Sequence, residues 1–341
     1  MKRLICGLFV CLVLCGCAAG AGQPEKKQYT ATFLTLFDTV TTIKGPAESE
    51  EAFRELTQPI HDALLECHQL FDIYNDYEGI NNLKTVNDAA GIAPVEVDQR
   101  IIDLLNDCKS YYELTDGRVN VAMGSVLQLW HEARNESIRL PDKAYLPERS
   151  ALEEASRHMD FSAVVIDEEA STVFLTDPAV RLDVGAIAKG WAAEYVADRA
   201  PEGLLLSVGG NVRATGPKDE KGSPWVVGIQ DPRDPSAHVH TLYLHKGSLV
   251  TSGDYQRTYA VDGVAYHHII DPDTLYPSEY WSSVTIVCED SGLADALSTA
   301  LFVVDQQAGQ ALLTAVGAEA LWIDREGNCF YSPGFQDLIR T

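Results

Sequence analysis

Residues 181–211, RLDVGAIAKGWAAEYVADRAPEGLLLSVGGN, decide the fold class. They begin at a strand end, and the small and apolar residues of the run Val184–Ala200 predict a helix. Leu204–Val208 then predicts a buried strand that ends in Gly209-Gly210-Asn211. This glycine pair is not part of a G-x-G-x-x-G pattern, so a Rossmann dinucleotide-binding unit is excluded.

The rest of the chain mixes helices with strands that we expect to be antiparallel. Strands are predicted at residues 29–43, 161–166, 172–176 and several times within 225–288, followed by a final pair near 320–331. Helices are predicted at residues 48–74, from the capping Asp98 to Gly117, at 293–304 and at 307–315. Pro59 predicts a kink or break in the first of these helices. The order of elements therefore predicts an α+β fold.

Composition excludes two classes of protein. The chain of 341 residues carries 26 Lys and Arg against 50 Asp and Glu, a formal net charge of −24, so it would repel nucleic acid. With 46% hydrophobic residues, 14 Tyr and 10 Phe, it can fill a core and is not expected to be disordered. P-loop, zinc-protease and α/β-hydrolase motifs are absent from the sequence.

The first 28 residues predict export. Residues 1–16 have a basic start and an apolar run that is too short to span a membrane but suits a signal peptide. They end in Leu14-Cys15-Gly16-Cys17, which resembles a bacterial lipobox and implies cleavage before Cys17 and a lipid on its sulfur. An ordinary cleaved signal is the alternative. We expect residues 17–28 to be a tether, residues 29–341 to be one extracytoplasmic domain, and the lipid alone to hold this acidic body at the membrane.

The four remaining cysteines are scattered singly and lack zinc-ligand spacing. We expect buried free thiols at Cys67, Cys108, Cys288 and Cys329.

Three stretches carry candidate chemistry. Asp295, Ser298 and Thr299 share a helix face, and their oxygen atoms suit a hard cation such as Mg²⁺. Solvated or capping side chains are the alternative, and an exposed helix carboxylate adds little stability, so Asp295→Ala is expected to leave the fold intact. His267 and His268 close a strand and point to opposite faces, so one of them is a candidate base near neutral pH or a structural histidine.

The strand-to-helix stretch at residues 181–190 is the third. Its small residues let a ligand approach the backbone, and a helix N-terminus favours an anion. Lys189 can meet a phosphate there as a point charge. A tight packing corner is the alternative.

Nine blocks occur in a fixed order along about residues 30–340. They are Phe37-Asp38-Thr39, Phe71 to Tyr74 with Asn87, Thr115 to Trp130, Asp183 to Gly190, Ser207 to Asn211, Trp225 to Pro232, Thr251 to Tyr255, Tyr266 to Pro272 and Asp295 to Thr299. Together they resemble the ApbE family of FAD:protein FMN transferases. The resemblance implies a mixed α/β fold related to the tunnelling fold, with FAD in a cleft.

The resemblance also implies an activity. It is Mg²⁺-dependent transfer of FMN from FAD to a Thr or Ser hydroxyl of an acceptor protein, with AMP released. The implied acceptors are extracytoplasmic subunits of Rnf- or Nqr-type redox pumps, or FMN-binding domain proteins. An FAD pyrophosphatase and a flavin-binding surface lipoprotein without catalysis are the alternatives.

Family roles map onto single positions of this chain. Asp295 and Thr299 match side-chain metal ligands, and Ala186 matches a ligand through its backbone carbonyl. Ser298 stands where some members carry a second Asp, and His268 matches the base for the acceptor hydroxyl. The positions that match contacts to FAD are Phe37, Tyr74, Arg118, Val119, Asn120, Asp183, Lys189 and Ile270. Departures include Asp38 and Leu275 in place of Gly, and Asn120 in place of Asp.

Overall fold

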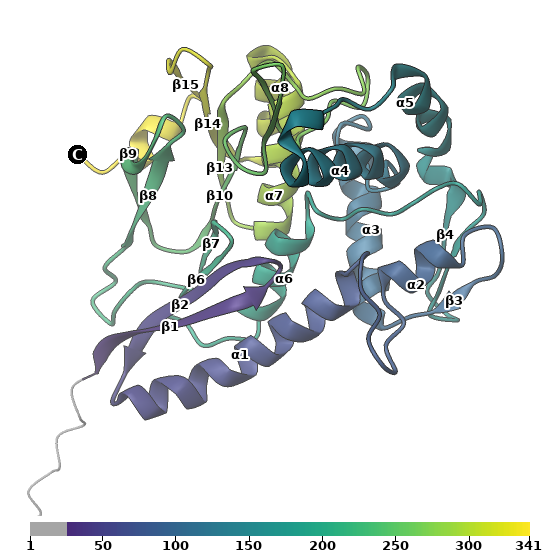
Figure 1. Ribbon diagram of the computed structural model, residues 1–341. Helices are drawn as coiled ribbons and strands as arrows, with labels where there is room; N and C mark the ends of the chain where they lie inside the picture. The colour runs from purple at the N-terminus through teal and green to yellow at the C-terminus, as the bar shows by residue number, and fades with distance from the viewer. Residues whose placement is uncertain (1–25) are drawn as a thin grey trace, which may run out of the picture.

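The computed structural model describes residues 26–341, so the predicted signal peptide and Cys17 lie outside the described residues (Figure 1). Its centre is an open sheet of eight antiparallel strands in the order β1-β2-β6-β7-β10-β13-β14-β15. These strands are β1 (Lys27–Leu36), β2 (Thr39–Ala47), β6 (Leu205–Val208), β7 (Asn211–Ala214), β10 (Gly247–Gly253), β13 (Ser283–Cys288), β14 (Glu319–Ile323) and β15 (Cys329–Tyr331).

Both faces of the sheet are covered. On one face lie α1 (Glu50–Phe71), α6 (Ala188–Ala197), α7 (Ser291–Ala300) and α8 (Gln306–Val316) (Figure 1). On the other packs the hairpin of β8 (Trp225–Asp231) and β9 (Asp234–Leu244). Adjacent residues of β10 show this two-sided burial, because Leu249 belongs to the core under the hairpin and Val250 to the core under the helices. Central strands such as β10 and β13 therefore bury residues on both of their faces.

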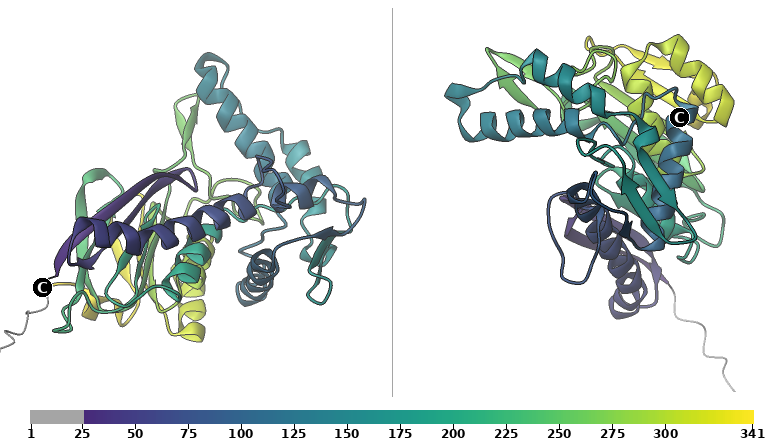
Figure 2. Two further views of the ribbon diagram at one scale, coloured as in Figure 1. Left: turned by 90° about the horizontal axis from the view of Figure 1, so that it is seen from below. Right: turned by 90° about the vertical axis from the view of Figure 1, so that its right-hand side faces the viewer.

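A second, mostly helical region lies beside the sheet (Figure 2). It contains α2 (Leu83–Asp88), α3 (Gln99–Leu114), α4 (Gly124–Arg139), α5 (Arg149–Ala155) and a small sheet of β3 (Val95–Glu96), β5 (Thr172–Leu175) and β4 (Val164–Asp167). The hairpin of β11 (Tyr259–Val261) and β12 (Val264–Tyr266) packs against α4. Short 3₁₀ turns lie at Pro141–Lys143, Ser156–His158, Phe161–Ala163, Leu301–Val303 and Phe335–Leu338.

The α+β prediction is confirmed, with local differences. Residues 29–43 are not one strand but parts of β1 and β2, because Phe37 and Asp38 adopt positive φ of 52° and 53° and form a two-residue hairpin turn. Pro59 does not break α1. It lies on the exposed face of the helix, where water can bond the carbonyl that loses its partner.

Other boundaries show which signals were reliable. The Asp98 side chain accepts a hydrogen bond from the backbone N–H of Arg100 and caps α3 as predicted. The predicted hairpin of β4 and β5 is present, and α7 begins two residues before the predicted 293 because Asp290 caps it. The sequence patterns did not indicate α2, α4 and α5. Nor did they show that residues 184–187 form a turn and that α6 begins only at Ala188.

All four cysteines of the described part are free, but only Cys67 and Cys108 are fully buried, whereas Cys288 and Cys329 are half-buried. Burial raises the pKa of the Cys67 thiol to about 12, so this thiol stays protonated at neutral pH. Within residues 26–341, every helix is too short or too polar to cross a membrane.

Candidate active site

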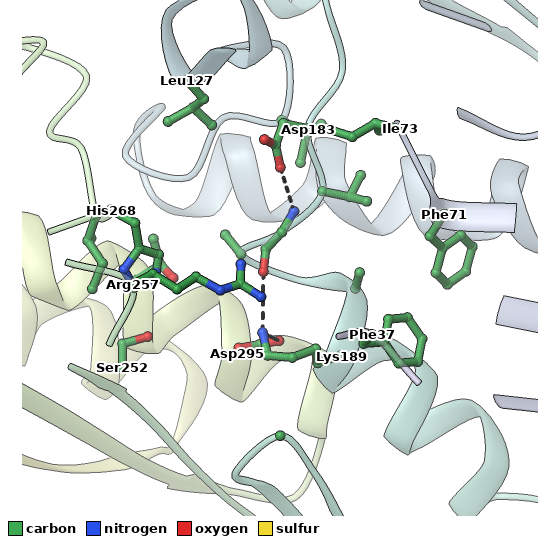
Figure 3. A pocket seen from close by; sticks show the side chains of 18 of the residues that line it. Phe37, Phe71, Ile73, Leu127, Asp183, Lys189, Ser252, Arg257, His268 and Asp295 are labelled. Carbon is green, nitrogen blue, oxygen red and sulfur yellow. Dashed lines mark hydrogen bonds and ion pairs between the residues drawn. The ribbon is translucent and has the colours of Figure 1, made fainter. Parts of the chain in front are cut away.

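One pocket lies where the β1–β2 turn, the end of α1, the start of α6, α7 and two long loops meet (Figure 3). It is lined by all of the predicted site residues in the described part except Ser298. These are Phe37, Tyr74, Arg118, Val119, Asn120, Asp183, Ala186, Lys189, His268, Ile270, Asp295 and Thr299. Residues as far apart in the sequence as Phe37 and Thr299, 262 positions, thus line the same pocket.

The inner end of the pocket is the crossing of α6 and α7. Gly190 makes the crossing possible, because a Cβ at this position would lie 2.2 Å from the Ser291 carbonyl oxygen and 2.5 Å from the Asp295 Cβ. The close approach lets the backbone N–H of Gly190 donate to Asp295 Oδ2 at 2.9 Å. Lys189 Nζ lies 3.5 Å from the same oxygen. A carboxylate on one helix is therefore fixed by the backbone of the other.

Asp295 is buried, which corrects the expectation of an exposed helix carboxylate. Only 3% of the residue is exposed. Burial raises its pKa, while the Lys189 ammonium and the Gly190 N–H oppose that rise. Because Lys189 and the Gly190 N–H only partly offset the burial of this charge, a bound cation would stabilise the carboxylate further.

Ser298 does not line the pocket. Its hydroxyl lies 2.8 Å from Ser252 Oγ and donates to the Asp295 carbonyl at 2.8 Å, one turn back in α7. The side chain therefore supports Ser252, which does line the pocket. Asp295, Thr299 and the Ala186 carbonyl remain as the oxygen donors at this end, a set that fits Mg²⁺ by its chemistry. Groups of three or more His, Cys, Asp or Glu side chains that could hold a metal are absent from residues 26–341.

The turn that precedes α6 is held from both ends. Asn87 donates to the Leu182 carbonyl at 2.9 Å and accepts from the Leu182 N–H at 2.7 Å, so a single amide clamps this backbone. The Asp183 carboxylate accepts from the Gly185 N–H at 2.9 Å, and Lys189 Nζ lies 3.3 Å from the Gly185 carbonyl (Figure 3). These bonds replace the first helical turn that the sequence predicts and turn residues 184–187 toward the pocket.

Aromatic residues form the wall near the sheet. The positive φ of Phe37 places its ring near His68, with ring centroids 5.6 Å apart, and its N–H donates to His68 Nδ1 at 3.3 Å. Tyr74 follows the end of α1, where Asp72 accepts from the Tyr74 N–H at 2.6 Å. Although Tyr74 is 60% exposed, its hydroxyl lies 2.9 Å from His131 Nδ1. Hydrogen bonds at the backbone N–H and at the hydroxyl of Tyr74 therefore fix the position of its ring.

The outer wall consists of the loop after α3 and the segment before β13. Arg118 forms an ion pair with Asp273 and lies 3.8 Å from Asp271, which joins these two loops. Asn120 directs its side chain into the protein, donating to the Met159 carbonyl and accepting from the Ala122 N–H. The side-chain amide of Asn120 is thus already hydrogen-bonded within the protein, and the backbone groups of this residue remain for a ligand. Val119 and Ile270 contribute buried apolar surface.

The two adjacent histidines have different surroundings, as the predicted alternation requires. His267 is buried, and its Nε2 lies 2.8 Å from the Ser278 carbonyl, so it is structural. His268 lines the pocket, and its buried Nδ1 has no hydrogen-bond partner within the described part of the chain. Burial, with nearby Arg257, lowers the pKa of His268 to about 3. It is therefore neutral at pH 7 in the ligand-free protein.

Sequence reasoning missed several pocket residues with polar side chains, among them His131 and Arg257. His131 lies on α4, a helix that no pattern indicated, so its position beside Tyr74 could not be expected. Arg257 follows the Thr251–Tyr255 block and has a φ of 49°. A non-glycine residue in this conformation is uncommon, and only the structure shows it.

Comparison with known proteins agrees with the resemblance in the sequence. The ApbE family model matches residues 37–322. The chain belongs to the ApbE family. A protein of Treponema pallidum named FAD:protein FMN transferase is 32% identical, covering 98% of this chain and 95% of its own length. A second relative of that name, from Klebsiella pneumoniae, is 33% identical and covers 74% of this chain and 79% of its own. The crystal structure of the ApbE protein of Thermotoga maritima superposes with a TM-score of 0.82 at 31% identity, covering 92% of this chain and 100% of that one.

Two departures from the ApbE pattern fall at backbone positions that favour glycine. Asp38 and Leu275 adopt φ of 53° and 66°. An aspartate tolerates the left-handed region, whereas a leucine is strained there. Leu275 is 5% exposed and belongs to an apolar cluster with Trp130, whose indole N–H donates to the Leu275 carbonyl at 3.0 Å. Burial of the side chain thus offsets the strain that the larger residue brings.

Proposed function

We propose that this ApbE family member transfers FMN from FAD to a Thr or Ser hydroxyl of an acceptor protein and releases AMP. The observation that carries the proposal is the content of this pocket: three oxygen donors, Lys189 and the neutral His268 line it together. Relatives that cover most of the chain bear the name of this activity. FAD is a diphosphate, and the pocket offers it cationic side chains in a chain of strongly acidic composition.

The reaction balances as a phosphoryl transfer. The oxygen of the acceptor hydroxyl forms a bond to the phosphorus of the FMN half, and the bond from that phosphorus to the bridging oxygen breaks. AMP leaves with the bridging oxygen, and the hydroxyl proton goes to His268. An imidazole must be neutral to accept this proton, as His268 is in the free protein, and it must then hold the proton, which the negative phosphates of bound FAD would favour.

Asp295, Thr299 and the Ala186 carbonyl would hold Mg²⁺, which would neutralise diphosphate charge and polarise the reacting phosphoryl group. The ammonium of Lys189, now 3.5 Å from Asp295, can donate to a phosphate oxygen from the same place. Gly190 fixes the carboxylate, and the Asn87 clamp fixes the turn that carries Ala186. These groups are set before substrate binds, which lowers the cost of reorganisation in the transition state.

The proposal includes a location. The lipobox at residues 14–17 supports cleavage of the signal before Cys17 and a lipid anchor on that cysteine. The acceptor would then be an extracytoplasmic flavoprotein, such as an Rnf- or Nqr-type subunit or an FMN-binding domain protein.

A transfer assay tests the proposal. The protein is mixed with FAD, Mg²⁺ and an FMN-binding acceptor domain, and covalent flavin is followed by in-gel fluorescence and by the mass of the acceptor. We expect labelling and AMP with the unmodified protein and neither with Asp295→Asn. Release of FMN and AMP without labelling would instead indicate an FAD pyrophosphatase. Bound FAD without turnover would indicate a flavin-binding lipoprotein and overturn the proposal.

A further inference from the structure

A small second pocket lies beside His268, and neither Lys189 nor Asp295 lines it. Arg134 of α4, Arg257, Tyr259 of β11 and His268 contribute to its wall. His268 and Arg257 also line the flavin pocket, so the two pockets meet at these side chains. Figure 3 shows Arg257 extending from the side of His268 toward the centre of the flavin pocket.

The charges of this second pocket are not balanced. Within residues 26–341, neither Arg134 nor Arg257 forms an ion pair with a carboxylate. Arg118, in the same flavin pocket, pairs with Asp273. Tyr259 is only 7% exposed, and its hydroxyl has no partner in the described part of the chain, like Nδ1 of His268. The two guanidinium groups repel each other, and the Asp183 carboxylate offsets only part of the effect that Arg257 has on Arg134, so a further anion would stabilise both arginines.

We propose that Arg134 and Arg257 form a binding site for a carboxylate side chain of the acceptor protein, next to the hydroxyl that receives FMN. The inference rests on the proposed function, because it takes His268 as the group that meets the acceptor hydroxyl. It assigns the two arginines to recognition of an acidic acceptor segment.

Placement favours the acceptor over FAD as the source of the anion. The groups suited to the diphosphate, Lys189 and Asp295 with its neighbours, line the flavin pocket and are absent from the second one. Arg134 lines the second pocket together with His268 but does not line the flavin pocket, so a chain whose hydroxyl reaches His268 can meet Arg134 outside the space for FAD. The charge of the whole molecule, −24, opposes an acidic partner at long range. A local pair of cations would offset that repulsion only where the acceptor must dock.

Peptide binding tests the site without relying on turnover. The probes are two fluorescein-labelled peptides that differ in one residue, Asp or Asn, beside the accepting position. That position carries Val, so that nothing can be transferred. Their affinities for the full chain, saturated with FAD and Mg²⁺, are measured by fluorescence anisotropy. The variants are Arg134→Gln and, as a matched control on the exposed face of the same helix, Arg139→Gln, whose arginine pairs with Glu136.

We expect Arg134→Gln to weaken binding of the Asp peptide about tenfold, as for one charge-assisted hydrogen bond. The Asn peptide, the affinity for FAD and the Arg139→Gln protein should be unchanged. Equal affinity of the unmodified protein for the two peptides would overturn the inference. So would a loss of FAD affinity in Arg134→Gln with no change in peptide binding, because the arginines would then serve the diphosphate.

A parallel assay with Thr at the accepting position separates the two proposals. Arg134-dependent preference for the Asp peptide without any FMN transfer would contradict the proposed function and leave the carboxylate site standing. Transfer to both peptides at equal rates and equal affinity would support the function and overturn the site.

Discussion

The two ends of the pocket are built in different ways. The inner end is made by α6 and α7, two helices of the core, where Asp295 is fixed by the backbone of Gly190. The outer wall is made by the loop after α3 and the segment of residues 254–277, and ion pairs such as Arg118 with Asp273 hold it. Buried, backbone-fixed groups move little, whereas half-exposed loops open at low cost. The difference suggests that the inner end fixes the chemistry and the outer wall admits the substrates.

Asp295→Asn gives the largest expected effect and tests the inner end. The amide keeps the shape and can still accept the Gly190 N–H, but it removes the charge that would hold Mg²⁺. We expect transfer to fall at least about 1,000-fold, the loss of several kcal/mol of charge stabilisation. The metal-free variant should be more stable to heat than the unmodified protein, because burial disfavours the charge. Asp290→Asn, which keeps the cap of α7, is the control.

Asp295→Ala is a less informative test of the metal site, because it changes stability as well, whereas the sequence suggested that it would leave the fold intact. It would leave the Gly190 N–H without an acceptor inside the protein, which costs about 1–3 kcal/mol. Full activity in either Asp295 variant would refute a metal role for this residue.

His268→Gln tests the outer wall. General base catalysis contributes about 100- to 10,000-fold, so transfer should fall within that range while the affinity for FAD stays nearly unchanged. Equal losses in transfer and in FAD affinity would make His268 a binding residue instead.

The pH dependence sharpens this assignment. In the free protein the pKa of His268 is about 3, because burial and Arg257 disfavour the imidazolium. Two negative phosphates nearby favour the imidazolium, so FAD binding should raise this pKa. The acid limb of kcat, which reports the complex, should therefore lie at higher pH than that of kcat/KM for FAD, which reports the free protein. Rate profiles between about pH 4 and 9, the range over which His can titrate, should therefore show an acid limb in kcat and none from His268 in kcat/KM for FAD. A kcat profile that stays flat down to about pH 4 would argue against the raised pKa of His268 in the complex.

The sequence predicted the inner end better than the outer wall, and the reason is physical. Asp295 and Thr299 lie four residues apart on one helix, so local spacing alone places them on one face. Nothing local indicates that Asp295 is buried, because its burial depends on Gly190, 105 residues away. Arg134 stands on a helix with no evident start signal, since α4 lacks a side-chain N-cap. The β1–β2 turn was missed because its positive φ values fall on Phe37 and Asp38 and not on Asn-Gly.

Gly190→Ala and a matched glycine variant of the outer region compare how the two ends of the pocket respond to an added Cβ. The added Cβ would force α6 from α7, costing about 1–3 kcal/mol of unfolding free energy. It should also lower transfer up to about 100-fold, because a displacement near 1 Å misplaces Asp295. Gly263→Ala is the matched control in the outer region. Its Cβ meets nothing, but its φ is 82°, so it should cost about 1–2 kcal/mol and leave transfer unchanged. Equal effects on transfer would contradict the proposed division of the pocket.

The difference between two variants of Leu275 is the smallest effect that we expect, and it concerns stability alone. Leu275→Ala keeps the left-handed backbone and loses the buried side chain, so it should cost about 2–5 kcal/mol, the usual range for such a truncation. Leu275→Gly removes one more carbon but also removes about 1–2 kcal/mol of backbone strain. A glycine adds about 0.4–1 kcal/mol of unfolded-chain entropy, so the net advantage of Gly over Ala should be near 1 kcal/mol. Urea unfolding of the two variants measures the order directly. If Ala proved the more stable, the strain at φ 66° would be too small to matter, and the leucine at this position would carry no backbone cost.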